Sequence, residues 1–136
     1  MKSFALLLGT LAVVLSPTTG SAKSITAKQG EAKLAKLLQG RTAGAPVSCI
    51  DTPYRIGGGG LQVIEGVGVV YDAGKKIFVA RTIDPKMLRW TDRLDVSRAV
   101  STRLCASDRM VARDRSTGMQ TGPVFLTDFV PYTRAG

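Results

Sequence analysis

The spacing of hydrophobic positions changes twice along this chain. A largely apolar run over residues 4–15 precedes a segment with helical spacing, residues 26–39, and short alternating stretches follow. Apolar residues that recur every three or four positions indicate an amphipathic helix, whereas strict alternation indicates a half-buried strand. The pattern therefore predicts one helix near the start of the chain and mostly strands after it.

The first 22 residues are typical of a secretory signal peptide. Residues 1–3 include one lysine, the apolar run follows, and residues 20–22 place small side chains before an expected cleavage after Ala22. The alternative is a transmembrane anchor, but about 20 apolar residues are needed to cross a bilayer and this run is shorter. We therefore expect a periplasmic or secreted protein with no stable membrane span in the mature chain.

The helix expected over residues 26–39 is amphipathic. Thr26 and Gln29 have the capping-box spacing, and Gly40 stands where a glycine ends many helices. Its apolar and basic positions lie mostly on opposite faces: Leu34, Leu37 and Leu38 against Lys28, Lys33 and Lys36. A basic amphipathic helix can bind a membrane surface. The short apolar stripe, which lacks aromatic residues, favours a helix packed on the domain instead.

Short strands are expected over the rest of the chain. They cover residues 47–51, 61–65, a hairpin of 67–71 with 77–80, an alternating stretch at 94–100, a strand pair of 104–105 with 110–113 joined near 106–108, and a final strand at 124–130 that follows a long turn and ends at Pro131. Asp84 and Pro85 are expected to begin a single helical turn. The four glycines at 57–60 indicate a flexible turn.

The predicted fold class is mainly β (α+β). We expect a small antiparallel sheet or partly open barrel of six to seven strands, with one N-terminal amphipathic helix after the cleaved signal peptide. The expected organisation is a signal peptide at 1–22, a basic helical segment at 23–42 and a disulfide-bridged β domain at 43–136.

The chain has two cysteines, Cys49 and Cys105. Two cysteines in a secreted chain most simply pair with each other. The alternative is a redox pair or a reactive thiol, but the chain has no Cys-x-x-Cys motif and no histidine to activate a thiolate. A structural bridge is therefore favoured.

The formal net charge of +9 is concentrated in two segments. Residues 23–42 hold five basic and one acidic residue, and residues 81–115 hold nine basic and five acidic residues. Such an excess favours an anionic partner such as anionic lipid, polysaccharide or an exported protein, although it can also simply keep a protein soluble. Nucleic acid is not expected as a partner outside the cytoplasm. The candidate contacts are Lys28, Lys33, Lys36, Arg89, Arg93, Arg98 and Arg103.

The sequence offers little support for catalysis. Without histidine the chain lacks the commonest general base and metal ligand, so we expect no enzyme, no metal and no cofactor. Gly57–Gly60 and Gly74-Lys75 lack the context of a phosphate loop and are interpreted as turns. A glycosidase-type carboxylate pair would have to come from Asp51, Glu65, Asp72, Asp92, Asp95, Asp108, Asp114 and Asp128.

Asp108 and Trp90 each allow two interpretations. Asp108 can accept bonds from backbone amides in a turn or pair with Arg109 or Arg113. Trp90, between Arg89 and Arg93, could provide a stacking surface, although partial burial as a packing residue is favoured. Phe125 and Phe129 share strand parity and are expected in the core.

Three stretches, residues 41–50, 104–108 and 129–134, carry a resemblance to a known family. Their Cys-Ile, Leu-Cys-x-x-Asp and terminal Phe-x-Pro motifs resemble a family of small, exported, uncharacterised proteins of Gram-negative proteobacteria, over roughly residues 36–134. The resemblance implies a Cys49–Cys105 bridge, a periplasmic location and a small β domain, and it includes Asp108 in the family pattern. It implies no activity, and the glycine run at 57–60 departs from that pattern.

Three functions are compatible with these observations. The favoured one is a non-enzymatic binding or accessory domain whose basic surface contacts an anionic envelope component. A second is an inhibitor or partner of an exported protein, acting through an edge strand or the 57–60 loop. The third, a carboxylate-type hydrolase, requires two acids gathered in a concave pocket.

Overall fold

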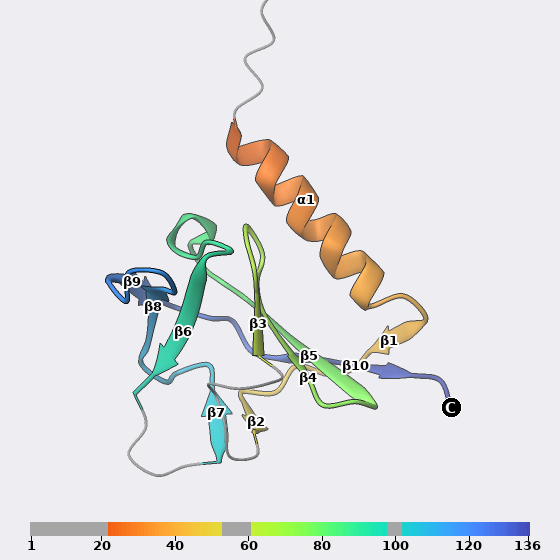
Figure 1. Ribbon diagram of the computed structural model, residues 1–136. Coiled ribbons are helices and arrows are strands. Elements are labelled where there is room, and N and C mark those ends of the chain that lie inside the picture. Colours follow the sequence, from red (N-terminus) through yellow and green to blue (C-terminus); the bar gives the residue numbers. More distant parts are fainter. Residues whose placement is uncertain (1–21, 53–60, 98–101) are drawn as a thin grey trace, which may run out of the picture.

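The computed structural model describes residues 22–52, 61–97 and 102–136, with side chains from residue 27 onward, so the predicted signal peptide and the glycine run at 57–60 lie outside it. The described residues form one helix, one short 3-10 turn and ten strands (Figure 1). In chain order these are α1 (Ala22–Leu37), β1 (Arg41–Ala43), β2 (Cys49–Asp51), β3 (Leu61–Ile64), β4 (Gly68–Asp72), β5 (Lys76–Arg81), η1 (Pro85–Met87), β6 (Asp92–Val96), β7 (Arg103–Cys105), β8 (Met110–Asp114), β9 (Gln120–Val124) and β10 (Val130–Arg134).

The strands form three antiparallel sheets. One sheet has the order β1-β10-β5-β4-β3, the second pairs β2 with β7, and the third has the order β6-β8-β9. None of the three closes into a barrel. The predicted class, a small mainly β domain with one helix, is confirmed. There are more strands than the expected six to seven because the chain is divided into short pieces, of which β1, β2 and β7 have three residues each.

Helix α1 packs on one face of the five-stranded sheet, as the short apolar stripe predicted. Leu34 is buried against a cluster that includes Ile64 and Val70, and Leu37 and Leu38 pack at its margin. The helix begins at Ala22, so Thr26 lies inside it rather than at its cap, and the predicted start was wrong. It ends at Leu37, two residues before the expected end, and Gly40 has a φ of 72° in the left-handed region, as expected for a glycine that follows a helix.

The contact between α1 and the sheet depends on Gly30. A Cβ atom at this position would lie 2.3 Å from the carbonyl oxygen of Glu65, in the turn between β3 and β4. One residue further along the helix, Glu31 forms a salt bridge with Arg81 of β5. Glycine therefore allows a close approach of helix and turn, and an ion pair ties the helix to the strand beside it.

The opposite face of the five-stranded sheet builds the larger core. Val69 and Ala80, both 0% exposed, pack there with Leu94 and Ala112 of the three-stranded sheet and with Leu104 of β7. The five-stranded sheet thus lies between α1 on one side and the two smaller sheets on the other, as Figure 1 shows.

Elements set by local sequence are found where the pattern predicts them. Strands β4 and β5 form the expected hairpin, with Tyr71 opposite Phe78. The carboxylate of Asp84 accepts a hydrogen bond from Lys86 N (3.0 Å) and begins the turn η1 at Pro85, as predicted.

The predicted pairing of residues 104–105 with 110–113 was wrong. Strand β7 pairs with β2, and β8 lies between β6 and β9 in another sheet. The chain does turn at residues 105–108, where Asp108 N donates to Cys105 O (3.0 Å). An alternating pattern identifies a strand but not its partner, because the pairing depends on contacts between residues that are distant in sequence.

The predicted final strand over residues 124–130 was also wrong. The chain leaves β9 at Val124 and begins β10 at Val130, so part of the long turn expected before residue 124 is strand. Pro131 lies inside β10 instead of ending the strand. Pro131 O accepts from Gly44 N (2.7 Å), beyond the last residue of β1. In an extended strand the nitrogen and the carbonyl oxygen of one residue point to the same side, so the nitrogen of Pro131 also faces Gly44. The missing N–H therefore removes no hydrogen bond to a residue of β1.

Candidate functional site

Most of the arginines proposed as anion contacts are already paired with aspartates. Arg93 Nε lies 3.2 Å from an oxygen of Asp95, and Arg103 Nε lies 3.5 Å from an oxygen of Asp51. Arg98 lies outside the described residues. The pairs are exposed, but each of these two arginines has an acid beside it, so neither adds an uncompensated charge to the surface.

Arg89 joins two carboxylates that face each other across β6 and β8. Asp92 and Asp114 are register partners, and Arg89 Nη2 lies 3.5 Å from Asp92 Oδ1 and 3.8 Å from Asp114 Oδ2. Asp92 is 0% exposed and accepts a hydrogen bond from Arg89 N (2.9 Å). The arginine therefore balances a buried charge, which an unpaired carboxylate could not keep without a large penalty.

Asp114 is held as an anion by the turn that follows it. Its Oδ1 accepts hydrogen bonds from the hydroxyl and amide of Ser116 and from the amide of Thr117. These bonds lower the pKa of Asp114 to about 2. A carboxyl group that ionises there cannot serve as a proton donor at neutral pH, so Asp114 does not fit the acid of a glycosidase pair.

Most of the other carboxylates have structural partners as well. Asp95 accepts from Arg113 Nε (2.7 Å) in addition to its pair with Arg93, and Asp72 accepts from Gly74 N (2.7 Å) in the β4–β5 turn. Within the part of the chain that the structure describes, no group of three or more His, Cys, Asp or Glu side chains could hold a metal ion.

The lysines of α1 form the basic surface that the structure leaves open. Lys28, Lys33 and Lys36 are exposed, and no acid among the described residues pairs with them. The one acid of the described helix, Glu31, is directed to Arg81, whose guanidinium holds the pKa of that carboxyl below its usual range. The lysine face, defined by these three lysines, therefore carries an uncompensated charge of three.

A second basic group lies where α1 meets the sheet, and sequence reasoning missed it. Arg41 and Arg134 are register partners on β1 and β10, and Arg41 donates to Lys75 O (3.1 Å) in the β4–β5 turn, next to Lys76. We call these four residues the basic end of the sheet. They are distant in sequence, and only the pairing of β10 between β1 and β5 brings them together.

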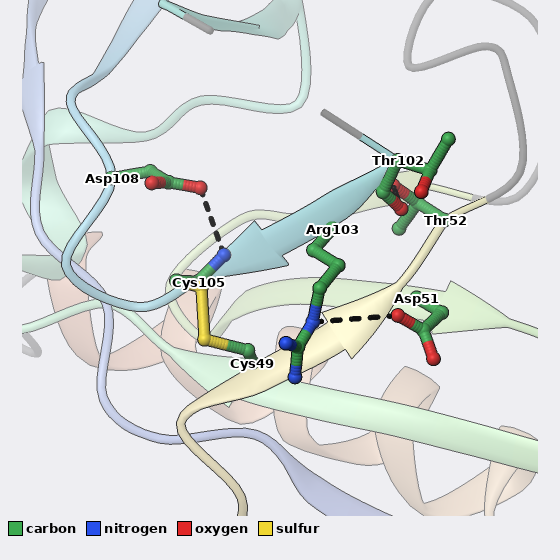
Figure 2. Close-up of a disulfide and its surroundings, with 7 residues drawn as sticks. All are labelled: Cys49, Asp51, Thr52, Thr102, Arg103, Cys105 and Asp108. Atoms are coloured by element: carbon green, nitrogen blue, oxygen red, sulfur yellow. Dashed lines mark hydrogen bonds and ion pairs between the residues drawn. A yellow bond between two sulfur atoms is a disulfide. The ribbon is translucent and has the colours of Figure 1, made fainter. Parts of the chain in front are cut away.

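The disulfide predicted from the sequence is present (Figure 2). Cys49 and Cys105 are register partners on β2 and β7, with Cα atoms 4.0 Å apart. Asp108 accepts a hydrogen bond from Cys105 N (2.8 Å), which is the turn role expected for it. Thr52 Oγ1 donates to Thr102 O (3.1 Å) at the other end of the pair. These bonds fix a two-stranded sheet that has only three residues per strand.

Two aromatic predictions were wrong. Trp90 is 71% exposed rather than a packing residue, and Phe125 is 64% exposed while Phe129 is fully buried. The parity argument failed for Phe125 because residues 125–129 connect two strands instead of forming one.

Comparisons with known proteins give no relative. No family model matches the chain, and neither a curated protein nor a solved structure is similar to it at a significant level. Among the described residues, no helix is long and apolar enough to cross a membrane.

Proposed function

We propose that this protein is a non-enzymatic binding domain of the periplasm or the extracellular space, which contacts an anionic envelope component. The single observation that carries the proposal is the lysine face of α1, whose charges have no acidic partner while the arginines of β6 and β7 are paired with aspartates. The basic end of the sheet adds to the positive electrostatic potential of the lysine face, because β1 follows α1 directly in the chain.

The proposed location rests on two features. The disulfide Cys49–Cys105 is compatible with an oxidising compartment, where such bridges persist. The first 22 residues have the composition of a signal peptide. An exported protein with this charge would meet anionic phospholipid headgroups and acidic polysaccharides.

A charge-matched pair of variants tests this function. Lys33→Gln with Lys36→Gln removes two unpaired charges, and Arg93→Gln with Arg103→Gln removes two charges that are paired with Asp95 and Asp51. Each lysine near an anionic surface contributes about 1 kcal/mol, so the first double variant should lose roughly 30-fold in affinity.

Cosedimentation with vesicles of phosphatidylglycerol and phosphatidylcholine at low and high salt provides the measurement. The arginine double variant should bind nearly as the wild type, because its charges are already compensated. Equal losses for both variants would mean that only net charge matters. Binding that is absent, or insensitive to salt, would remove an anionic lipid surface as the target.

A further inference from the structure

Four exposed apolar side chains lie on two adjoining segments of this molecule. Ile83 and Met119 are each 69% exposed, Trp90 is 71% exposed and Phe125 is 64% exposed. Among the described residues, the one other large apolar side chain that is exposed is Val47, at 38%. Single exposed apolar residues are ordinary, but several on neighbouring segments indicate a contact surface.

Backbone bonds place Ile83 beside Phe125. Thr82 and Leu126 form an isolated antiparallel bridge, and Ile83 N donates to Phe125 O (2.9 Å) one position further along. Thr82 and Leu126 are both buried, so the next pair in an antiparallel register turns to the opposite side. Directly opposite side chains in such a pair are close neighbours, so Ile83 and Phe125 lie together on the outside.

Strand β9 leads from Phe125 to the other two exposed side chains, Trp90 and Met119. At Gly122, in β9, a Cβ atom would lie 2.2 Å from Met87 Cε, so η1 rests on the strand backbone. Beyond η1, Arg115 N donates to Thr91 O (3.0 Å), next to Trp90. Asp114 N donates to Met119 O (2.9 Å) in the same turn. Ile83 and Phe125 therefore lie near one end of β9, and Trp90 and Met119 near the other.

We propose that these four side chains, the apolar row, insert into the interfacial region of an anionic phospholipid bilayer. This inference rests on the proposed function and commits it to lipid rather than polysaccharide. Tryptophan and phenylalanine place a large apolar surface at such an interface, and the indole N–H remains within reach of polar groups.

Basic residues beside the apolar row favour contact with an anionic bilayer. Lys86 and Arg115 are exposed beside it and have no acidic partner among the described residues. Their long stems can lie along apolar surface while the charged ends stay at the headgroups. Figure 1 shows the segment around η1 and the N-terminal end of α1 on the same, upper side of the molecule. Lys28, in the N-terminal half of α1, can thus attract the protein to an anionic surface as the apolar row enters it.

The single tryptophan of the chain makes the insertion directly measurable. Trp90 emission in the full protein should shift to the blue on addition of phosphatidylglycerol–phosphatidylcholine vesicles and should be quenched by brominated acyl chains. Pure phosphatidylcholine vesicles should leave the emission unchanged, because attraction to the surface requires anionic lipid.

Two variants separate insertion from attraction. Ile83→Ser and Phe125→Ser should each weaken vesicle binding about tenfold, since each removes apolar area from the inserted surface. Val47→Ser, an exposed apolar residue outside the row, is the control and should bind as the wild type. Circular dichroism checks that each variant is folded.

The possible failures are distinguishable. Salt-sensitive vesicle binding without a shift of Trp90 emission would overturn the inference and leave the proposed function standing. An absence of vesicle binding would overturn the inference and would leave acidic polysaccharide as the target of the proposed function. A concentration-dependent dimer that shifts Trp90 emission without lipid would assign the apolar row to a second copy of the chain.

Discussion

Individual carboxylates in this molecule hold turns together, and Asp114 is the clearest case. Its hydrogen bonds with Ser116 and Thr117 are local in sequence, yet the sequence did not distinguish Asp114 from the other candidate acids. Asp, Ser and Thr often form such turns, so the motif becomes evident only when the register of β8 and β9 is known. Phe125 shows the same limit, because its exposure depends on where β9 ends.

Asp114 should make stability depend on pH in acid. Its pKa in the folded protein is about 2, lower than the usual value of 3.8, so its stabilising effect is complete above pH 4 and is lost as the pH falls toward 2. In Asp114→Asn this part of the acid limb should disappear. Urea unfolding from pH 5 to pH 2 provides the measurement, and Ser116→Ala should show part of the same change. Parallel pH profiles of wild type and Asp114→Asn would contradict the assignment.

At the scale of elements, the sequence predicted what local chemistry determines. The β4–β5 hairpin follows from alternation on both sides of a glycine-containing turn, and η1 follows from Asp84 and Pro85. The partners of β7 and β10 depend on contacts between distant residues, so alternation could not give them. For the same reason the three lysines of α1 could be identified in advance, whereas the basic end of the sheet could not.

Gly30→Ala should loosen the contact between α1 and the sheet. Alanine favours a helix by up to about 1 kcal/mol, but its Cβ would overlap the carbonyl oxygen of Glu65. Relief requires the helix or the β3–β4 turn to move, which typically costs about 1–3 kcal/mol in a packed contact. We expect a net loss of about 1 kcal/mol by urea unfolding. Ala35→Ser, at an exposed position of the same helix, is the matched control. A gain in stability for Gly30→Ala would contradict the prediction and show that the β3–β4 turn moves at little cost.

At the scale of the whole molecule, the disulfide links distant parts of the chain. Cys49 and Cys105 are 56 residues apart in sequence, and the chain-entropy model gives a link of this length about 4 kcal/mol. That is a large share of the stability of a small domain. Without the disulfide, β2 and β7 would be held together by three residue pairs and the bonds of the residues next to them, such as that between Thr52 and Thr102.

Reduction should therefore lower the free energy of unfolding by about 4 kcal/mol. Urea unfolding with and without a thiol reductant gives this difference. A Cys49→Ala, Cys105→Ala double variant should resemble the reduced protein and should not respond to reductant. A reduced protein as stable as the oxidised one would mean that packing alone holds the two strands.

The position of β10 has a consequence for the order in which the molecule can be completed. This strand is made after the other nine described strands, yet it lies between β1 and β5 inside the five-stranded sheet rather than at an edge. During synthesis from the N-terminus, β1 and β5 both lack their partner strand until residues 130–134 have been made. A chain proposed to cross a membrane in an extended form would thus be unable to close its main sheet until β10 has been made.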